Sequence, residues 1–235
     1  MKKRIIAGLL TVLAAAALFS GCKKKEDGRD AIRSFGGTTK GIMVYHDFSV
    51  GDVVFEDFDT EKYDAEEFRG YLEADINAYN DAHEFTAKPT ETDKNGNVVY
   101  ESKVTKPVEI VKLEAADNLL CQQLLYATTD DFVAYNEAND GALTKRGGIT
   151  LQAGMLGEAD SSLLANVFVD KDGKELDMEK FVNAKDFAEY RYAICDIEST
   201  LYVEGAIKGY CGGAYSGDYN CMSVPAGTRV IVLFK

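Results

Sequence analysis

The chain has 235 residues, of which 46% are hydrophobic, enough apolar material to build a core in one or two domains. It is acidic, with 39 Asp and Glu residues against 26 Lys and Arg residues and a formal net charge of −13. Proteins that bind nucleic acid need clustered lysine and arginine side chains to replace the counterions of the phosphates. We therefore expect no nucleic-acid partner.

The first residues have the order of a secretory signal peptide. Met1 and the positive residues at 2–4 are followed by an uncharged, apolar stretch from Ile5 to Phe19. At about fifteen residues this stretch is shorter than the roughly 20 that a membrane-spanning helix needs. The sequence favours a cleaved signal over a permanent transmembrane anchor.

Ser20, Gly21 and Cys22 follow the apolar stretch directly. This junction resembles the lipobox of bacterial lipoproteins, with the departure that Phe19 stands where leucine is usual. The resemblance implies cleavage between Gly21 and Cys22 and attachment of a diacylglycerol to the Cys22 thiol, with acyl chains such as palmitate. The alternative is a plain buried or disulfide-bonded cysteine. A lipidated Cys22 would hold the body on the extracytoplasmic side of the cell membrane, because two acyl chains anchor a protein stably.

Residues 22–40 are then the lipidated N-terminus and a polar, glycine-containing flexible tether. Its three lysines at 23–25 would lie at the lipid headgroups, where each contributes about 1 kcal/mol on an anionic surface. Removing residues 1–21 takes away three positive charges and changes the formal net charge from −13 to −16.

The clearest element of the body is a helix from 65 to about 83. Asp64 is a good N-cap, Glu67 completes a capping box, and apolar residues recur at steps of three and four. A short helix at 130–138, capped by Thr129, is expected further on. Residues rich in β-branched and aromatic side chains predict strands before and between the helices, with a tight hairpin turn at Asn95-Gly96 and another turn at 115–118. These strands are 41–48, 52–58, 98–100, 108–113 and 119–127.

The second half predicts more strands separated by turns. An apolar run at 163–169 leaves through a turn at 170–174, and the last fifty residues supply strands at 187–197, 201–204, 207–211 and 229–234. The fold class expected is α+β, with a mostly antiparallel β-sheet, one long amphipathic helix and one short helix. We expect 41–235 to form a single globular domain, with a sub-boundary near 140–160 left open.

Two segments echo each other. Residues 75–82 align without gaps on 131–138 through the pattern D-x-x-A-Y-N-[DE]-A. This echo is either the trace of a duplicated helix–strand unit or a chance agreement of two amphipathic helices.

The lipobox, the stretch "DDFVAYN" after a strand pair and the β-rich C-terminal third ending in "VIVLF" together resemble the small, functionally uncharacterised lipoproteins of intestinal clostridia and their relatives. The resemblance implies an envelope-facing domain. It brings no catalytic motif and no site residue.

No reaction is indicated by a motif. His46 and His83 are the only histidines, and neither has a second ligand at metal-binding spacing. The stretch "GGAYSG" at 212–217 is not a nucleophile elbow. Acidic turns at 93–97 and 170–173 depart from the EF-hand pattern and are interpreted as hairpin turns. We expect no catalytic residue, no metal and no cofactor.

Five cysteines are present, and lipidation of Cys22 would leave Cys121, Cys195, Cys211 and Cys221. Cys211 and Cys221 are a candidate disulfide, because a hairpin across the intervening glycines could bring them together. Buried thiols are the alternative, and the sequence does not fix the redox state.

The glycine-rich stretch 209–221 carries Tyr210, Tyr215 and Tyr219, which we consider a candidate ligand-binding set. Tyrosine offers a large flat face with a hydrogen-bonding tip, which suits sugars and peptides. The alternative is an irregular loop whose tyrosines pack on the sheet.

The leading hypothesis is a lipid-anchored surface protein that binds an envelope component, a peptide or a glycan without catalysis. A cell-envelope hydrolase whose site is not visible in the sequence is a second hypothesis. A structural partner in an envelope complex is a third.

Overall fold

The computed structural model describes residues 41–102, 104–138, 148–216 and 220–235. Gly21, Cys22 with its expected lipid anchor, the expected tether and Tyr219 lie outside these ranges. The helices described are α3 (Ala65–Ala82), α4 (Thr129–Glu137), α5 (Ser161–Leu164) and α6 (Met178–Val182), with 3-10 turns η1 (Leu156–Glu158) and η2 (Phe187–Glu189). The strands are β1 (Gly41–Val44), β2 (Val50–Asp57), β3 (Glu91–Thr92), β4 (Val98–Tyr100), β5 (Val108–Ala116), β6 (Leu119–Tyr126), β7 (Leu151–Met155), β8 (Arg191–Cys195), β9 (Ser199–Val203), β10 (Ile207–Cys211), β11 (Ala214–Tyr215), β12 (Cys221–Val224) and β13 (Val230–Phe234).

The larger sheet has seven strands in the order β11-β12-β9-β1-β2-β6-β5. Its neighbours are antiparallel except for β1 and β9, which run parallel. β5 and β6 form a hairpin closed by Asp117 and Asn118, both with positive φ (53° and 61°). Aspartate and asparagine tolerate this conformation, which two-residue hairpin turns require.

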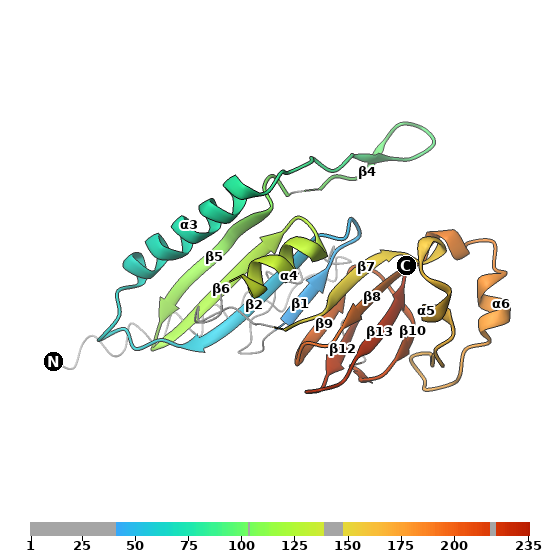
Figure 1. Cartoon of the computed structure of the whole chain (residues 1–235). Helices are drawn as coiled ribbons and strands as arrows, with labels where there is room; N and C mark the ends of the chain where they lie inside the picture. Colours follow the sequence, from blue (N-terminus) through green and yellow to red (C-terminus); the bar gives the residue numbers. More distant parts are fainter. Residues whose placement is uncertain (1–40, 103, 139–147, 217–219) are drawn as a thin grey trace, which may run out of the picture.

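A second sheet has four strands in the order β10-β13-β8-β7. All its neighbours are antiparallel. The small β3–β4 hairpin turns at Asn95-Gly96, where Gly96 has a φ of +82°. Figure 1 shows this hairpin projecting away from the sheets, beyond the end of α3.

α3 begins where the sequence predicts it. The Asp64 carboxylate accepts hydrogen bonds from the backbone N–H groups of Glu66 and Glu67, which have no partner inside the helix. Leu72, Ile76 and Tyr79 form the buried face of the helix, which packs along β5 (Figure 1). None of the described helices combines the length and hydropathy needed to cross a bilayer.

One hydrophobic cluster joins the two sheets. It contains Ile42 and Leu201 from the seven-stranded sheet, Cys195 and Val232 from the four-stranded sheet, and Phe132 from α4. A separate cluster covers the opposite face of the four-stranded sheet, where the segment between β7 and β8 packs on it. Both faces of the four-stranded sheet therefore pack against other parts of the chain.

The α+β class, the mostly antiparallel sheets and the single long helix are confirmed. The predicted N-cap of α4 is wrong by one residue. The Thr128 hydroxyl, not that of Thr129, accepts a hydrogen bond from the Asp131 N–H (2.9 Å). The strand expected at 187–197 begins only at Arg191, after the turn η2. β7, β12, α5 and α6 were not predicted.

Candidate functional site

The tyrosine-rich stretch is only partly assembled within the described residues. Tyr210 on β10 and Tyr215 on β11 are half-buried and stack with ring centroids 6.3 Å apart. Both pack against the large hydrophobic cluster, and neither lines the two cavities described below. The ligand-binding role of Tyr210, Tyr215 and Tyr219 remains a prediction.

The predicted disulfide between Cys211 and Cys221 is not formed. Cys211 lies on β10 of the four-stranded sheet, whereas Cys221 lies on β12 of the seven-stranded sheet. The glycines between them lead the chain from one sheet to the other instead of closing a hairpin on the two cysteines. The sequence could not show this, because it does not reveal which sheet each strand joins.

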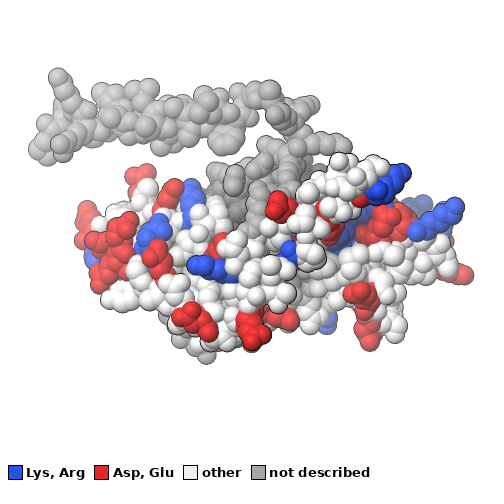
Figure 2. Space-filling view, turned by 90° about the horizontal axis from the view of Figure 1, so that it is seen from above, with Lys and Arg blue, Asp and Glu red and all other residues white. Residues whose placement is uncertain are grey.

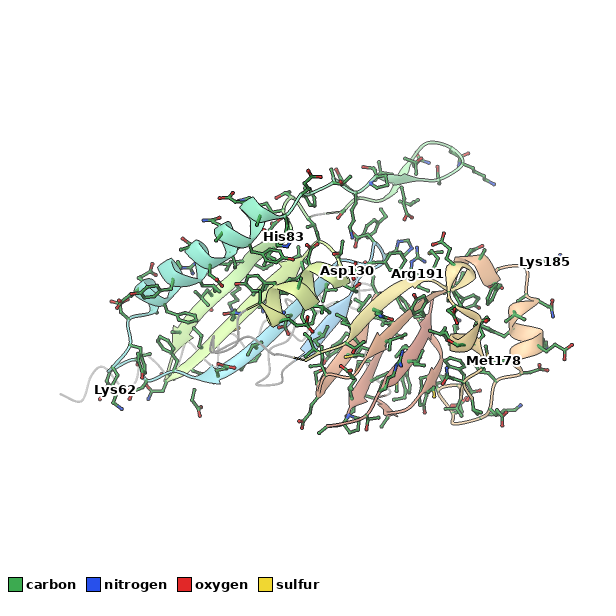
Figure 3. The ribbon with its side chains drawn as sticks, in the orientation of Figure 1. Lys62, His83, Asp130, Met178, Lys185 and Arg191 are labelled. Carbon is green, nitrogen blue, oxygen red and sulfur yellow. The ribbon has the colours of Figure 1, made fainter. Side chains whose placement is uncertain are left out.

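A group of charged and polar side chains surrounds His46, in the turn between β1 and β2. Arg191 donates from Nε to the His46 carbonyl oxygen (3.0 Å) and from Nη2 to His46 Nδ1 (3.1 Å). Glu204 Oε2 accepts from the His46 N–H (2.7 Å), and Glu91 Oε1 lies 3.6 Å from Nδ1. Arg191, labelled in Figure 3, is only 9% exposed. The group joins the β1–β2 turn to β3, β8 and the end of β9.

The charge state of His46 follows from these contacts. Burial and the neighbouring Arg191 lower the pKa of the imidazole, while Glu91 and Asp47 act in the opposite direction with smaller effect. A guanidinium can only donate, so Nδ1 must be unprotonated to accept from Arg191. His46 is therefore neutral near pH 7. We interpret the group as a structural junction, since its members bind one another.

His83 is similarly occupied. Its ring stacks on Tyr79 with centroids 3.8 Å apart, and Nδ1 lies 2.8 Å from the Tyr79 carbonyl oxygen, to which it donates when protonated. Among the described residues, neither histidine makes a hydrogen bond with a serine hydroxyl or a cysteine thiol. These contacts supply no activated nucleophile of the kind that acyl transfer needs.

Both acidic turns are confirmed as turns. Asp93 Oδ1 accepts from the N–H groups of Asn95 and Asn97, and Asp170 Oδ1 accepts from those of Asp172 and Lys174. Within the described ranges, no three His, Cys, Asp or Glu side chains come together in a group that could hold a metal ion.

A cavity of about 370 Å³ lies on the outer face of the four-stranded sheet. Sheet residues form its floor and the segment around α5 forms a wall; the lining residues are Gln152, Tyr192, Ile194, Arg229, Ile231, Asp160, Ser162, Leu163 and Asn166. We call it the Tyr192 pocket. Its volume is in the range of small-ligand sites.

Strand register explains why these groups meet. Gln152 pairs with Ile194, and Ile194 pairs with Ile231, so the three side chains form one row on the same face. Gly154 pairs with Tyr192, and a Cβ at position 154 would lie 3.1 Å from the Tyr192 ring. The missing side chain leaves the space over β7 to the tyrosine ring.

Three polar side chains in the pocket retain unused hydrogen-bonding capacity. Gln152, Tyr192 and Arg229 make no side-chain hydrogen bond or ion pair with any described residue. Asp160 accepts from the Ser162 N–H (2.8 Å), and hydrogen bonds from Ser162 lower the pKa of its carboxyl, so the carboxylate is ionised. Donors, acceptors and a ring thus meet over an apolar floor.

No sequence signal pointed to this pocket. β7 has the sequence LQAGM, with two small residues and only weak alternation, and was not predicted. Tyr192 and Ile194 are two residues apart in the strand expected at 187–197, so the sequence places them on one face of it. Gln152 and Arg229, which line the pocket with them, come from distant parts of the chain. Only the sheet order brings them together.

No family model, curated protein or solved structure matches the chain.

Proposed function

We propose that this chain is a lipid-anchored surface protein on the extracytoplasmic side of the cell membrane that binds a glycan of the cell envelope without catalysis. The lipobox-like junction at Gly21 and Cys22 supports the anchor. The body contributes the binding site, in the Tyr192 pocket.

The observation that supports glycan binding is the set of unpaired polar side chains in that pocket. A sugar hydroxyl both donates and accepts hydrogen bonds. It can pair with the Gln152 amide, accept from Arg229 and donate to Asp160. Tyr192 adds an aromatic surface with a polar tip, suited to the mixed apolar and hydroxylated faces of a sugar ring. The pocket size suits one or two sugar units.

The experiment is a binding measurement on the full-length protein in detergent micelles, using an array of bacterial envelope glycans and then calorimetry on any ligand found. Arg229→Ala and Tyr192→Phe should each weaken binding roughly 5- to 10-fold, since one hydrogen bond contributes about 1 kcal/mol. Gln152→Ala should act in the same direction.

Matched controls come from exposed residues that do not line the pocket. Lys180→Ala removes an exposed cation on α6, and Tyr71→Phe removes the hydroxyl of a tyrosine on α3 that is 69% exposed. Both should leave the affinity unchanged. The proposal would be refuted if the protein bound no glycan on the array, or if Arg229→Ala and Tyr192→Phe left the affinity unchanged.

A further inference from the structure

The Tyr192 pocket contains one side chain of each charge. Of its nine lining residues, Arg229 is basic, Asp160 is acidic and the other seven are neutral. Arg229 belongs to the floor, just before β13, and Asp160 belongs to the wall, just before α5. The two make no ion pair with each other or with any other described residue. The pocket lining is therefore neutral as a whole but holds two separate, unpaired charges.

The backbone is held by close contacts at both positions. Asp160 Oδ1 accepts from the Ser162 N–H (2.8 Å), and the Asp160 carbonyl oxygen accepts from the Leu163 N–H (2.9 Å). A Cβ at Gly212 would lie 2.5 Å from the Arg229 carbonyl oxygen, so the chain after β10 packs closely on the backbone that carries the guanidinium. The Asp160 carboxylate keeps acceptor capacity for a ligand, because a carboxylate offers about four lone-pair sites.

A second cavity has a different charge pattern. It measures about 340 Å³ and lies between α4 and residues 149–152. Its charged lining residues are Asp130, labelled in Figure 3, and Glu137, and none of its described lining residues is basic. Of the two cavities, the Tyr192 pocket is therefore the one that presents both a cation and an anion.

The charge of the chain disfavours a purely anionic ligand. Figure 2 shows acidic and basic side chains interspersed over one face, and the whole chain has a formal net charge of −13. A glycan that carries only carboxylates could pair with Arg229, but Asp160 and the acidic chain would repel it. A ligand with no net charge avoids this repulsion.

A neutral or purely cationic glycan also fits the two charges poorly. A neutral glycan would take water from Arg229 and Asp160 without pairing either charge, which costs free energy. A glycan that carries only amines could pair with Asp160 but would place its positive charge near Arg229. A ligand with one group of each sign pairs both side chains and leaves neither charge uncompensated.

We propose that the glycan bound in the Tyr192 pocket is zwitterionic, with a carboxylate that pairs with Arg229 and an ammonium group that pairs with Asp160. This inference rests on the glycan-binding function proposed above and specifies its ligand. The planar guanidinium suits a carboxylate through two parallel N–H···O bonds, and the compact ammonium group has three donors for the oxygens of Asp160. An amino-uronic acid is the simplest sugar of this class.

The probes are the methyl glycosides of glucose, glucosamine, glucuronic acid and glucosaminuronic acid, which differ only in whether they carry an amine and a carboxylate. Ligand-observed NMR titration of the full-length protein in detergent micelles would measure their affinities. A pH of about 6 keeps the amines protonated, since amines of this kind have a pKa of roughly 8. Glucosaminuronic acid should bind roughly 3- to 10-fold more tightly than each of the other three sugars, as expected for partly exposed ion pairs.

Two variants assign each ligand charge to its partner. In Arg229→Gln, glucosaminuronic acid should bind no more tightly than glucosamine. In Asp160→Asn, which keeps a good N-cap for α5, it should bind no more tightly than glucuronic acid. Lys185→Gln and Glu137→Gln remove exposed charges outside the pocket and should leave the order of affinities unchanged. Tyr192→Phe should weaken all four sugars to a similar extent, because it changes no charge.

Equal wild-type affinity for the four sugars, or an unchanged order of affinities in Arg229→Gln and Asp160→Asn, would overturn the zwitterionic ligand. Glycan binding itself would stand if Tyr192→Phe still weakened the sugars. Binding of none of the four would also overturn the inference, and a negative glycan array would then refute glycan binding as well. Glycylglycine is a zwitterion without a sugar ring and should bind more weakly than glucosaminuronic acid. Equal affinity for the two would show that no sugar is required and would overturn the inference.

Discussion

The Tyr135 hydroxyl on α4 donates a 2.9 Å hydrogen bond to Asp75 Oδ2 on α3. The reverse contact also exists, since the Tyr79 hydroxyl on α3 lies 3.3 Å from Asp131 Oδ1 on α4. The two tyrosine rings meet edge to face, with centroids 5.3 Å apart. Each helix thus binds the other through the same two positions of the pattern repeated at 75–82 and 131–138.

This reciprocity fits the topology around the helices. β2 precedes α3 and β6 precedes α4, and β2 and β6 are antiparallel neighbours in the seven-stranded sheet. Antiparallel strands are related by a local two-fold rotation, and reciprocal contacts are what such a rotation produces. The sequence echo therefore corresponds to a structural one, which supports a duplicated strand–helix unit over a chance agreement.

Removing the Tyr135 hydroxyl should destabilise the protein measurably. Burial and Asp75 raise the pKa of Tyr135, and burial and Asp131 raise that of Tyr79, so both hydroxyls stay protonated. Tyr135→Phe should lower the free energy of unfolding by about 1.5–3 kcal/mol, the range for a hydrogen bond to a charged group. Tyr79→Phe should cost less, because its contact is longer. Urea titrations followed by circular dichroism would measure both.

The control for this pair is Tyr71→Phe, whose hydroxyl bonds to Glu67 on the exposed face of α3. Surface changes of this kind cost about 0.5 kcal/mol or less. If Tyr135→Phe were no more destabilising than Tyr71→Phe, the contact between the helices would not contribute to stability.

Local patterns predicted the parts of the fold that depend on neighbouring residues. Asp64 and the apolar steps after it specify α3, because the N-cap and the buried face are both set within one turn or two. The capping box predicted with Glu67 is not seen, since the Glu67 carboxylate accepts from the Tyr71 hydroxyl. Asn95-Gly96 specifies the β3–β4 turn, since Gly96 supplies the positive φ. Thr128 and Thr129 are adjacent candidate caps, which explains an error of one residue at α4.

The candidate sites depend on strand order, which local patterns do not specify. Tyr192, Gln152 and Arg229 meet because β7, β8 and β13 are neighbours. The pairing of β1 with β9, across most of the chain, is likewise invisible in any short window. The tyrosines at 210 and 215 were the more conspicuous signal, yet they stack on each other and on the core.

His46 should make stability depend on pH. Its pKa in the folded protein is below the unfolded value of 6.5, so the unfolded chain binds more protons in the interval between the two. The free energy of unfolding should be largest above pH 6.5 and should fall as the pH decreases through that value. Unfolding titrations from pH 7.5 to pH 5 would show the slope.

His46→Gln is the matched variant, because glutamine cannot titrate and can still accept from Arg191. Its stability should change less over the same interval. Asp47, whose pKa is also lowered, titrates below its ordinary value of 3.8 and does not contribute in this window. Parallel curves for the two proteins would show that His46 is not the group responsible.

Gly213 and Gly96 give a comparison of two glycines with positive φ. A Cβ at Gly213 would lie 2.5 Å from the Ser223 carbonyl oxygen, whereas one at Gly96 would meet nothing within 4 Å. Gly96→Ala should lower the free energy of unfolding by about 1–2 kcal/mol, because the left-handed conformation is the only cost there. Gly213→Ala should cost clearly more, because the backbone of β12 must also move. Thermal unfolding of both variants measures the difference, and equal costs would contradict the close packing.

Cys22 should determine where the protein resides. Cys22→Ser removes the thiol to which the diacylglycerol would be attached, so the protein should remain unprocessed or leave the membrane fraction. Detergent phase partition and intact mass spectrometry would follow both changes. Cys121→Ser, at a half-buried position on β6, is the control and should keep the wild-type partition. A Cys22→Ser protein with the mass and membrane retention of the wild type would exclude lipidation at this residue, and the location of the body would then need another explanation.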